Sequence, residues 1–107
     1  MEIDQARLLC LRAAWMMDTH GNKAARTEVS AIKVVAARLQ TKIADRAMQV
    51  FGAGGLTNDT PLAFIYSWGR ALRFIDGPDE VHLRTVARAE IKKRRESNRS
   101  TFAEQGM

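Results

Sequence analysis

Residues 24–51 read AARTEVSAIKVVAARLQTKIADRAMQVF and carry the clearest structural signal of this 107-residue chain. Apolar side chains recur there at intervals of three and four residues, at Val29, Ile32, Ala36, Leu39, Ile43, Ala47 and Val50. This period is typical of an α-helix with one apolar face. Val34, Val35 and Ala37 make that face wide enough to contact more than one neighbour. We therefore predict a long helix from about Ala24 to Phe51 at the centre of a helical bundle.

Three further helices are predicted around that segment. Residues 3–20 keep a helical apolar period before a Gly21-Asn22 stop, and a shorter helix follows from Pro61 to residue 70 or 73. The last helix opens at Pro78 and runs to about Ser97. No segment alternates as a strand does. The sequence predicts an all-α fold, an antiparallel helical bundle of about four helices, with a domain of residues 1–97 and a flexible polar tail of residues 98–107.

The composition is that of a soluble globular domain. Hydrophobic residues make up 46% of the chain and charged residues 27%, which is too apolar for a disordered chain. No run approaches the roughly 20 apolar residues of a membrane span, and the first residues lack the pattern of a signal peptide. The single cysteine, Cys10, cannot form an internal disulfide. We expect Cys10 to be a buried apolar residue in a reducing, intracellular compartment.

The net charge of +5 is concentrated near the end of the chain. Residues 84–99 hold seven basic and two acidic residues, while the remainder holds ten of each. Such a segment can attract nucleic acid or acidic lipid, but it is also typical of a solvated helix end, where the helix dipole favours cations. The solvated helix is the preferred interpretation, so nucleic acid is not an expected partner. A basic helical interaction or oligomerisation module without catalysis of its own is the alternative.

Few residues have the spacing of a known catalytic or ligand-binding motif. Gly52-Ala53-Gly54-Gly55 suggests a dinucleotide-binding loop, but that motif needs a preceding strand and a glycine at its sixth position, where Thr57 stands. The run instead predicts a helix end with a tight turn. His20 and His82 have no partner at metal-ligand spacing, so no metal site is predicted. No serine or cysteine has the pattern of a nucleophile with a base.

Asp76 is the carboxylate with two possible interpretations. It follows Phe74-Ile75 directly, and a carboxylate that emerges from apolar surroundings is a stronger base than one in water. It also precedes Gly77, and an Asp-Gly pair is common in ordinary turns. From the residues alone, we favour an ordinary turn residue, and a catalytic base is the alternative interpretation of Asp76.

Two stretches together resemble paired signatures of the acyl-CoA dehydrogenases. They are residues 49–56, QVFGAGGL, and residues 74–81, FIDGPDEV. In addition, residues 8–14, LLCLRAA, resemble the helix that precedes these signatures in the family. The resemblance implies the C-terminal helical domain of that fold, without its first helix and the flavin-contacting arginine on it. It also implies that an N-terminal helical domain and a β domain are missing. We therefore expect the chain alone to be inactive and to bind little FAD.

The resemblance implies a role for each matching residue. Asp76 would be the base that removes the α-proton of an acyl-CoA thioester, while the N5 atom of FAD accepts a hydride from the β-carbon. Gly77 would approach the substrate. The residues that would contact the flavin at the start of the last helix are Pro78, Asp79 and Glu80. The residues that would meet the adenine-nucleotide end of FAD, from a neighbouring subunit, are Gln49, Val50, Phe51, Gly52 and Ala53.

Three positions depart from the usual pattern of the family. Most members have Glu at position 76, Thr-Ser at Pro78-Asp79, and a second Gly at Ala53. A shorter carboxylate needs a differently placed backbone or a different acyl group. The resemblance further implies acyl-CoA as substrate, a homo-oligomer, dimer or tetramer, and a mitochondrial, peroxisomal or bacterial cytoplasmic location. Neither a metal nor a membrane span is expected.

Overall fold

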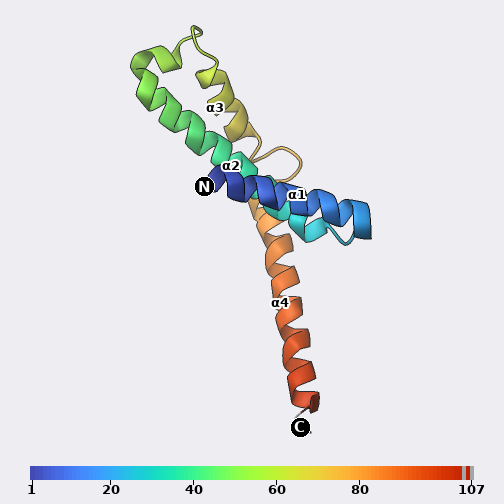
Figure 1. Ribbon diagram of the computed structural model, residues 1–107. Coiled ribbons are helices and arrows are strands. Elements are labelled where there is room, and N and C mark those ends of the chain that lie inside the picture. Colours follow the sequence, from blue (N-terminus) through green and yellow to red (C-terminus); the bar gives the residue numbers. More distant parts are fainter. Residues whose placement is uncertain (105, 107) are drawn as a thin grey trace.

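A computed structural model describes residues 1–104 and 106 of the chain, and it consists of helices joined by short turns (Figure 1). Helix α1 spans Glu2–His20, α2 spans Arg26–Phe51, α3 spans Leu62–Ala71 and α4 spans Asp79–Glu104, and a 3-10 turn, η1, spans Gly52–Leu56. No strand occurs among the residues described. The predicted all-α class with about four helices is confirmed.

Helix α2 is the common packing partner of the other elements. Helices α1, α3 and α4 each pack against α2, and over residues 1–104 these three helices do not pack against one another. The predicted central position of this helix is confirmed. Its buried residues are mostly small, which lets three neighbours approach its axis, and they are Ser30, Val34, Ala37 and Ala44.

Glycines allow α3 and η1 to pack closely on α2. A Cβ added at Gly69 of α3 would lie 3.0 Å from Oγ1 of Thr41. A Cβ at Gly55 of η1 would lie 3.0 Å from the Cα of Met48. Helix α2 itself ends at Gly52, whose φ of 62° is in the left-handed region that glycine adopts freely. The chain can therefore turn back along α2 within a few residues.

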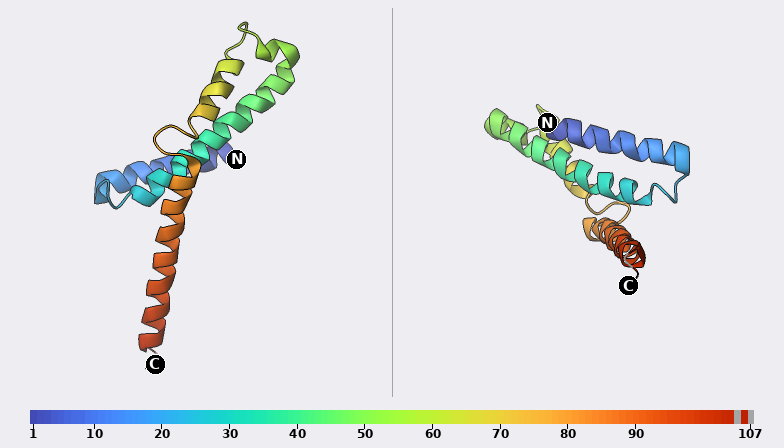
Figure 2. Two further views of the ribbon diagram at one scale, coloured as in Figure 1. Left: turned by 180° about the vertical axis from the view of Figure 1, so that it is seen from behind. Right: turned by 60° about the horizontal axis from the view of Figure 1, so that its bottom comes forward.

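The chain is elongated because α4 projects away from the other helices (Figure 2). Its extents are 68 × 27 × 26 Å and its radius of gyration is 18.8 Å, against about 13 Å for a compact chain of this length.

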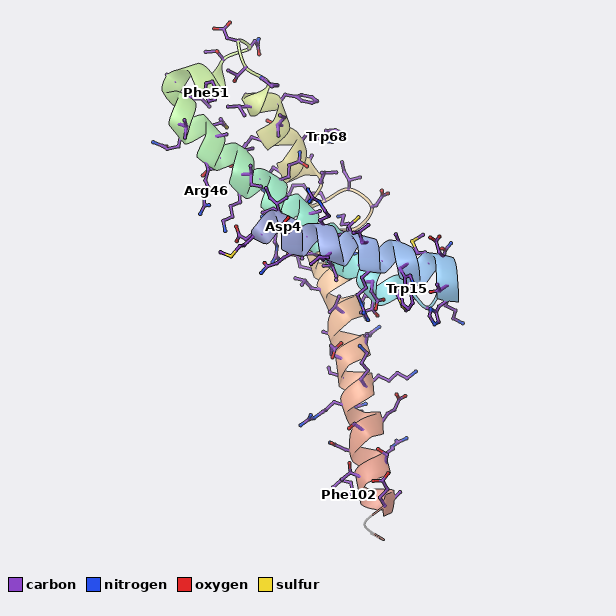
Figure 3. All side chains as sticks on the ribbon, viewed as in Figure 1. Asp4, Trp15, Arg46, Phe51, Trp68 and Phe102 are labelled. Carbon is purple, nitrogen blue, oxygen red and sulfur yellow. The ribbon has the colours of Figure 1, made fainter. Side chains whose placement is uncertain are left out.

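Large apolar side chains such as Trp15 and Trp68 stay exposed on outer faces (Figure 3). Cys10, predicted to be buried, is exposed, since within the described part of the chain α1 packs only against α2. The buried hydrophobic residues are small, namely Ala13, Ala25, Val34, Ala37 and Ala44.

Helix α4 is longer than the sequence indicates. It continues to Glu104, so the helix end predicted near Ser97 is too early. The physical reason is that no Gly or Pro interrupts residues 79–104. Residues 98–104, predicted to be tail, therefore extend the helix, with their side chains exposed. Residues 105 and 107 of that tail lie outside the described residues, and its flexibility stays a prediction.

Candidate active site

The turn between α3 and α4 carries Asp76. Asp76 has a φ of 54° and Gly77 a φ of 100°, so two consecutive residues are in the left-handed region. Glycine adopts that region freely, and Asp is one of the few other residues that visit it. The N–H of Asp79 donates to the carbonyl oxygen of Arg73 at 3.2 Å and closes the turn. The Asp-Gly pair therefore redirects the chain from α3 into α4.

Side chains hold the carbonyl groups of both residues. Nζ of Lys33, on α2, donates to the carbonyl oxygen of Gly77 at 2.6 Å. Nε2 of His82, on α4, lies 3.0 Å from the carbonyl oxygen of Asp76. Because a carbonyl oxygen only accepts, this second bond requires a proton on Nε2. The pair is thus tied to two different helices.

Asp79 anchors the base of the turn. Its residue surface is 2% exposed, and its Oδ2 accepts hydrogen bonds from Nε of Arg73 at 2.8 Å and from Nε of Arg38, on α2, at 3.1 Å. Burial alone would raise the pKa of Asp79, but the hydrogen bonds from Arg73 and Arg38 outweigh it and hold the pKa below its ordinary value. The carboxylate is therefore ionised and joins the start of α4 to α2 and to the end of α3.

The Asp76 carboxylate differs from that of Asp79. Asp76 is exposed, and its side chain forms no hydrogen bond or ion pair within the part of the chain that is described. Phe74 and Ile75 are 61% and 38% exposed. The apolar surroundings predicted for Asp76 are therefore not formed by this chain alone, which leaves the turn open on one side. The predicted site residues that solvent also reaches beside Asp76 are Gly77, Pro78 and Glu80.

The second group of predicted site residues surrounds the glycine bend, residues 49–56. An open hollow of about 390 Å³ lies there. Val50 and Phe51, 84% and 61% exposed, do not line it. A Cβ added at Gly52 would meet no atom within 4 Å, so the backbone at Gly52 is bare. The residues that line the hollow include the predicted Gln49, Gly52 and Ala53, together with Asp45, Met48 and Leu56.

The structure does not bring these two groups together within one chain. They lie at opposite ends of α3 (Figure 1). Helix α3 has 10 residues, which rise by about 15 Å. A ligand that touches Asp76 in this chain is therefore separated from the glycine bend of the same chain by at least the length of that helix.

Both histidines contact other groups of the protein. Nδ1 of His20 lies 2.6 Å from Oγ1 of Thr19, and its ring packs edge-on against Trp15. No cluster of His, Cys, Asp or Glu that could hold a metal ion occurs in residues 1–104 and 106. Within the same residues, none of the helices has a stretch long and apolar enough to cross a lipid bilayer.

Four residues that hold the Asp76 turn in place were not predicted from the sequence. Lys33, Arg38, Arg73 and His82 contact the turn, yet none stands in a recognised motif. Lys33 and Arg38 are separated by 44 and 41 residues from their partners. The one available signal is the position of Lys33, between the apolar residues 32 and 34 of a wide apolar face.

Comparison with known proteins gives a consistent result. The family model described as "Acyl-CoA dehydrogenase, C-terminal domain" matches residues 1–91. The chain is 59% identical over 102 residues to "Probable acyl-CoA dehydrogenase FadE2" of Mycobacterium tuberculosis, which covers 95% of this chain and 24% of that protein. It is 54% identical over 92 residues to acyl-CoA dehydrogenase family member 10 of Mus musculus, covering 86% of this chain and 9% of that protein.

A solved structure agrees with the sequence comparisons. A Mycobacterium abscessus protein assigned to the acyl-CoA dehydrogenases superposes with a TM-score of 0.84 at 51% identity, over 86% of this chain and 23% of that one. The chain thus spans about a quarter of the length of these two mycobacterial relatives. From this agreement of sequence and fold, the chain belongs to the acyl-CoA dehydrogenase family, in which it matches the C-terminal helical domain.

Proposed function

We propose that this chain supplies the catalytic base of a flavin-dependent acyl-CoA dehydrogenase, which oxidises the α,β carbon–carbon bond of an acyl-CoA thioester. The observation that carries this proposal is the Asp76 carboxylate, which is exposed and without a partner among the described residues, on a turn held at both of its carbonyl groups. A positioned carboxylate of this kind can accept a proton from a reacting carbon. Asp79, three residues later, cannot take this role, because its carboxylate is buried and two arginines donate to its Oδ2.

In this proposal the residues of the turn have different roles in the reaction. Asp76 accepts the α-proton on a carboxylate oxygen, which requires the thioester α-carbon to come within hydrogen-bond reach. Gly77, without a side chain, lets the acyl group pass close to the backbone. FAD, when bound, supplies the acceptor for the hydride that leaves the β-carbon. Closure by the rest of the enzyme would exclude water from Asp76, the condition under which a carboxylate acts as an effective base.

The residues of the chain fit FAD at two separate places. At the turn, Pro78 and Glu80 are exposed beside Asp76 and can contact the flavin, whereas Asp79 is buried and its N–H donates to the carbonyl of Arg73. At the glycine bend, the bare backbone at Gly52 and the amide of Gln49 face open space and an open hollow. Exposed backbone amides suit a nucleotide phosphate.

The distance between these places favours a homo-oligomer. Because α3 separates them, FAD beside Asp76 of one subunit would take its adenine-end contacts from the glycine bend of another, in a dimer or tetramer. The chain spans 24% of the length of its FadE2 relative, so an N-terminal helical domain and a β domain would supply the remaining contacts to FAD and acyl-CoA. The exposed Trp15 and Trp68 are candidates for burial against them.

Replacement of Asp76 in the complete enzyme tests the proposal. Asp76→Asn keeps the size of the side chain but removes the base, so acyl-CoA dehydrogenation should fall by at least about 10³-fold, with FAD content unchanged. Asp18→Asn, at an exposed aspartate near the end of α1, is the matched control and should keep normal turnover. Turnover of Asp76→Asn within a few-fold of the wild-type value would exclude Asp76 as the base.

A further inference from the structure

We propose that Lys33 is a positioning residue for the reaction, because it sets the orientation of the Asp76 carboxylate through the carbonyl group of Gly77. The inference rests on the proposed function, since orientation of Asp76 matters to turnover only if Asp76 is the base. Lys33 lies on α2, outside any known motif, and would act together with the residues of the turn.

The contact of Lys33 is short and comes from outside the turn. Its Nζ lies 2.6 Å from the carbonyl oxygen of Gly77, 44 residues further along the chain. A hydrogen bond from an ammonium group is stronger than one between neutral groups. Of the two side chains that hold Asp76 and Gly77, His82 belongs to α4, which begins within the same turn. Lys33 belongs to α2, the helix that organises the whole domain.

The choice of partner argues against a purely electrostatic role. Lys33 is half-buried, and a charge taken out of water is usually balanced by an opposite charge. Within residues 1–104, however, Lys33 forms no ion pair, and its contact is a neutral backbone oxygen. Lys42, an exposed lysine of the same helix, does pair with a carboxylate, with its Nζ 2.6 Å from Oε1 of Glu2. Lys33 therefore holds a backbone group instead of neutralising a carboxylate.

The conformation of Gly77 explains why such a contact is needed. Glycine has no side chain to restrict it, so the φ of 100° at Gly77 is only one of several accessible values. If the Gly77 carbonyl were released, the peptide groups around it could rotate, and the Asp76 side chain would change direction with them. Asp79 fixes the neck of the turn but not its tip. The bond from Lys33 selects one conformation of the tip.

A misplaced catalytic carboxylate lowers the turnover rate of an enzyme more than it weakens substrate binding. A shift of about 1 Å in a reacting group can reduce turnover by about 10²-fold. Removal of the Lys33 donor should therefore lower kcat by about 10- to 100-fold, while KM for the acyl-CoA changes by less than about threefold. A residue that only stabilises the domain would instead lower the amount of folded, FAD-loaded enzyme and leave the kcat of that enzyme unchanged.

The experiment compares four variants of the complete, FAD-loaded enzyme, with kcat expressed per bound FAD. Lys33→Met removes the donor and keeps the length of the side chain, and it should show the loss of kcat. Lys33→Arg keeps a cationic donor and should recover most of it. Lys42→Met removes an equally short bond from the same helix, made to Glu2 and not to the turn, and should leave kcat unchanged. Asp76→Asn reports separately on the proposed function.

The outcomes separate the two proposals. If Asp76→Asn is inactive and Lys33→Met has normal kcat, the role of Lys33 is wrong and the function stands. If Asp76→Asn is active, both are wrong. Equal kcat losses in Lys33→Met and Lys42→Met, or no recovery in Lys33→Arg, would also overturn the role of Lys33. Should Lys33→Met not fold, Lys33→Ala, which also lacks a donor, replaces it, and a kcat equal to that of Lys33→Arg is the overturning result.

Discussion

Arg73 and Asp79 stand on either side of Asp76 in the sequence and are joined by a hydrogen bond of 2.8 Å between Nε of Arg73 and Oδ2 of Asp79. Arg38 adds a second bond to the same oxygen from α2. The two aspartates of the turn therefore have separate parts. Asp79 is buried and holds the neck of the turn, while the carboxylate of Asp76 stays exposed at its tip.

Asp79→Asn should destabilise the domain at neutral pH. The variant leaves two arginines facing a neutral amide, and we expect the free energy of unfolding to fall by about 1–2 kcal/mol. This is less than for a fully buried pair, because the side chains of Arg38 and Arg73 are 49% and 33% exposed. Thermal unfolding of the complete enzyme measures the effect, with Asp18→Asn as the control. Equal melting temperatures for the two variants would contradict the anchoring role.

The effect of Asp79→Asn should depend on pH in a defined direction. The pKa of Asp79 in the folded protein is held below its ordinary value, which is about 3.9 in an unfolded chain. Its carboxylate therefore stabilises the fold above about pH 4, and this contribution is lost as the pH falls through the lower, folded-state pKa. The difference in melting temperature between wild type and variant should be largest near neutral pH and shrink in acid. A difference that is constant down to about pH 3 is the contrary result.

Gly77→Ala should damage the turn itself. Alanine at a φ of 100° is strained by about 1–2 kcal/mol, and its Cβ would lie 3.1 Å from Nε2 of His82. We expect a lower melting temperature together with a lower kcat, because the carboxylate of Asp76 would move with the backbone. Gly54→Ala serves as the control for stability, since a Cβ there meets nothing within 4 Å and needs no left-handed φ. Similar melting temperatures for the two variants would contradict this account.

Gly69→Ala should disturb the packing of α3 on α2. The added methyl group would lie 3.0 Å from Oγ1 and 3.3 Å from the backbone N of Thr41, and the backbone cannot move aside without shifting α2. Overpacking of this kind costs about 1–3 kcal/mol. Chemical denaturation should show the loss, which Thr41→Ala in the same chain should partly relieve by removing the nearest atom. An unchanged unfolding midpoint in Gly69→Ala would mean that the helices do not approach so closely.

The 107-residue chain by itself should self-associate. Among the residues described, the buried hydrophobic side chains are alanines and one valine, whereas Trp15, Trp68 and Phe64 are 55%, 51% and 71% exposed. Exposed apolar surface of this extent usually belongs to an interface. Sedimentation of the isolated chain should show species larger than a 12.0 kDa monomer, with little FAD bound after mixing. A monodisperse monomer, or a chain that retains FAD, would contradict the expectation that other domains cover these faces and bind the flavin.

Local patterns were sufficient for the helices and for the turn of Asp76. The apolar period of residues 24–51 predicts α2 because helical periodicity acts over one or two turns of chain. The Gly-rich run and the Asp-Gly-Pro sequence predict their bends because each restricts or frees its own backbone. The end of α4 was less predictable, since polar residues 98–104 contain neither Gly nor Pro and can continue a helix or fray from it.

The sequence by itself thus determined the all-α class, the central helix and, through its resemblance, the family and the candidate base. Only the tertiary structure decided that Asp79 is turned inward onto Arg38 and Arg73, that Lys33 meets the carbonyl of Gly77, and that the glycine bend lies a helix length from Asp76. The reason is physical. A residue's own backbone preferences act between near neighbours, whereas contacts across 41 to 44 residues exist only once α3 and α4 have packed against α2.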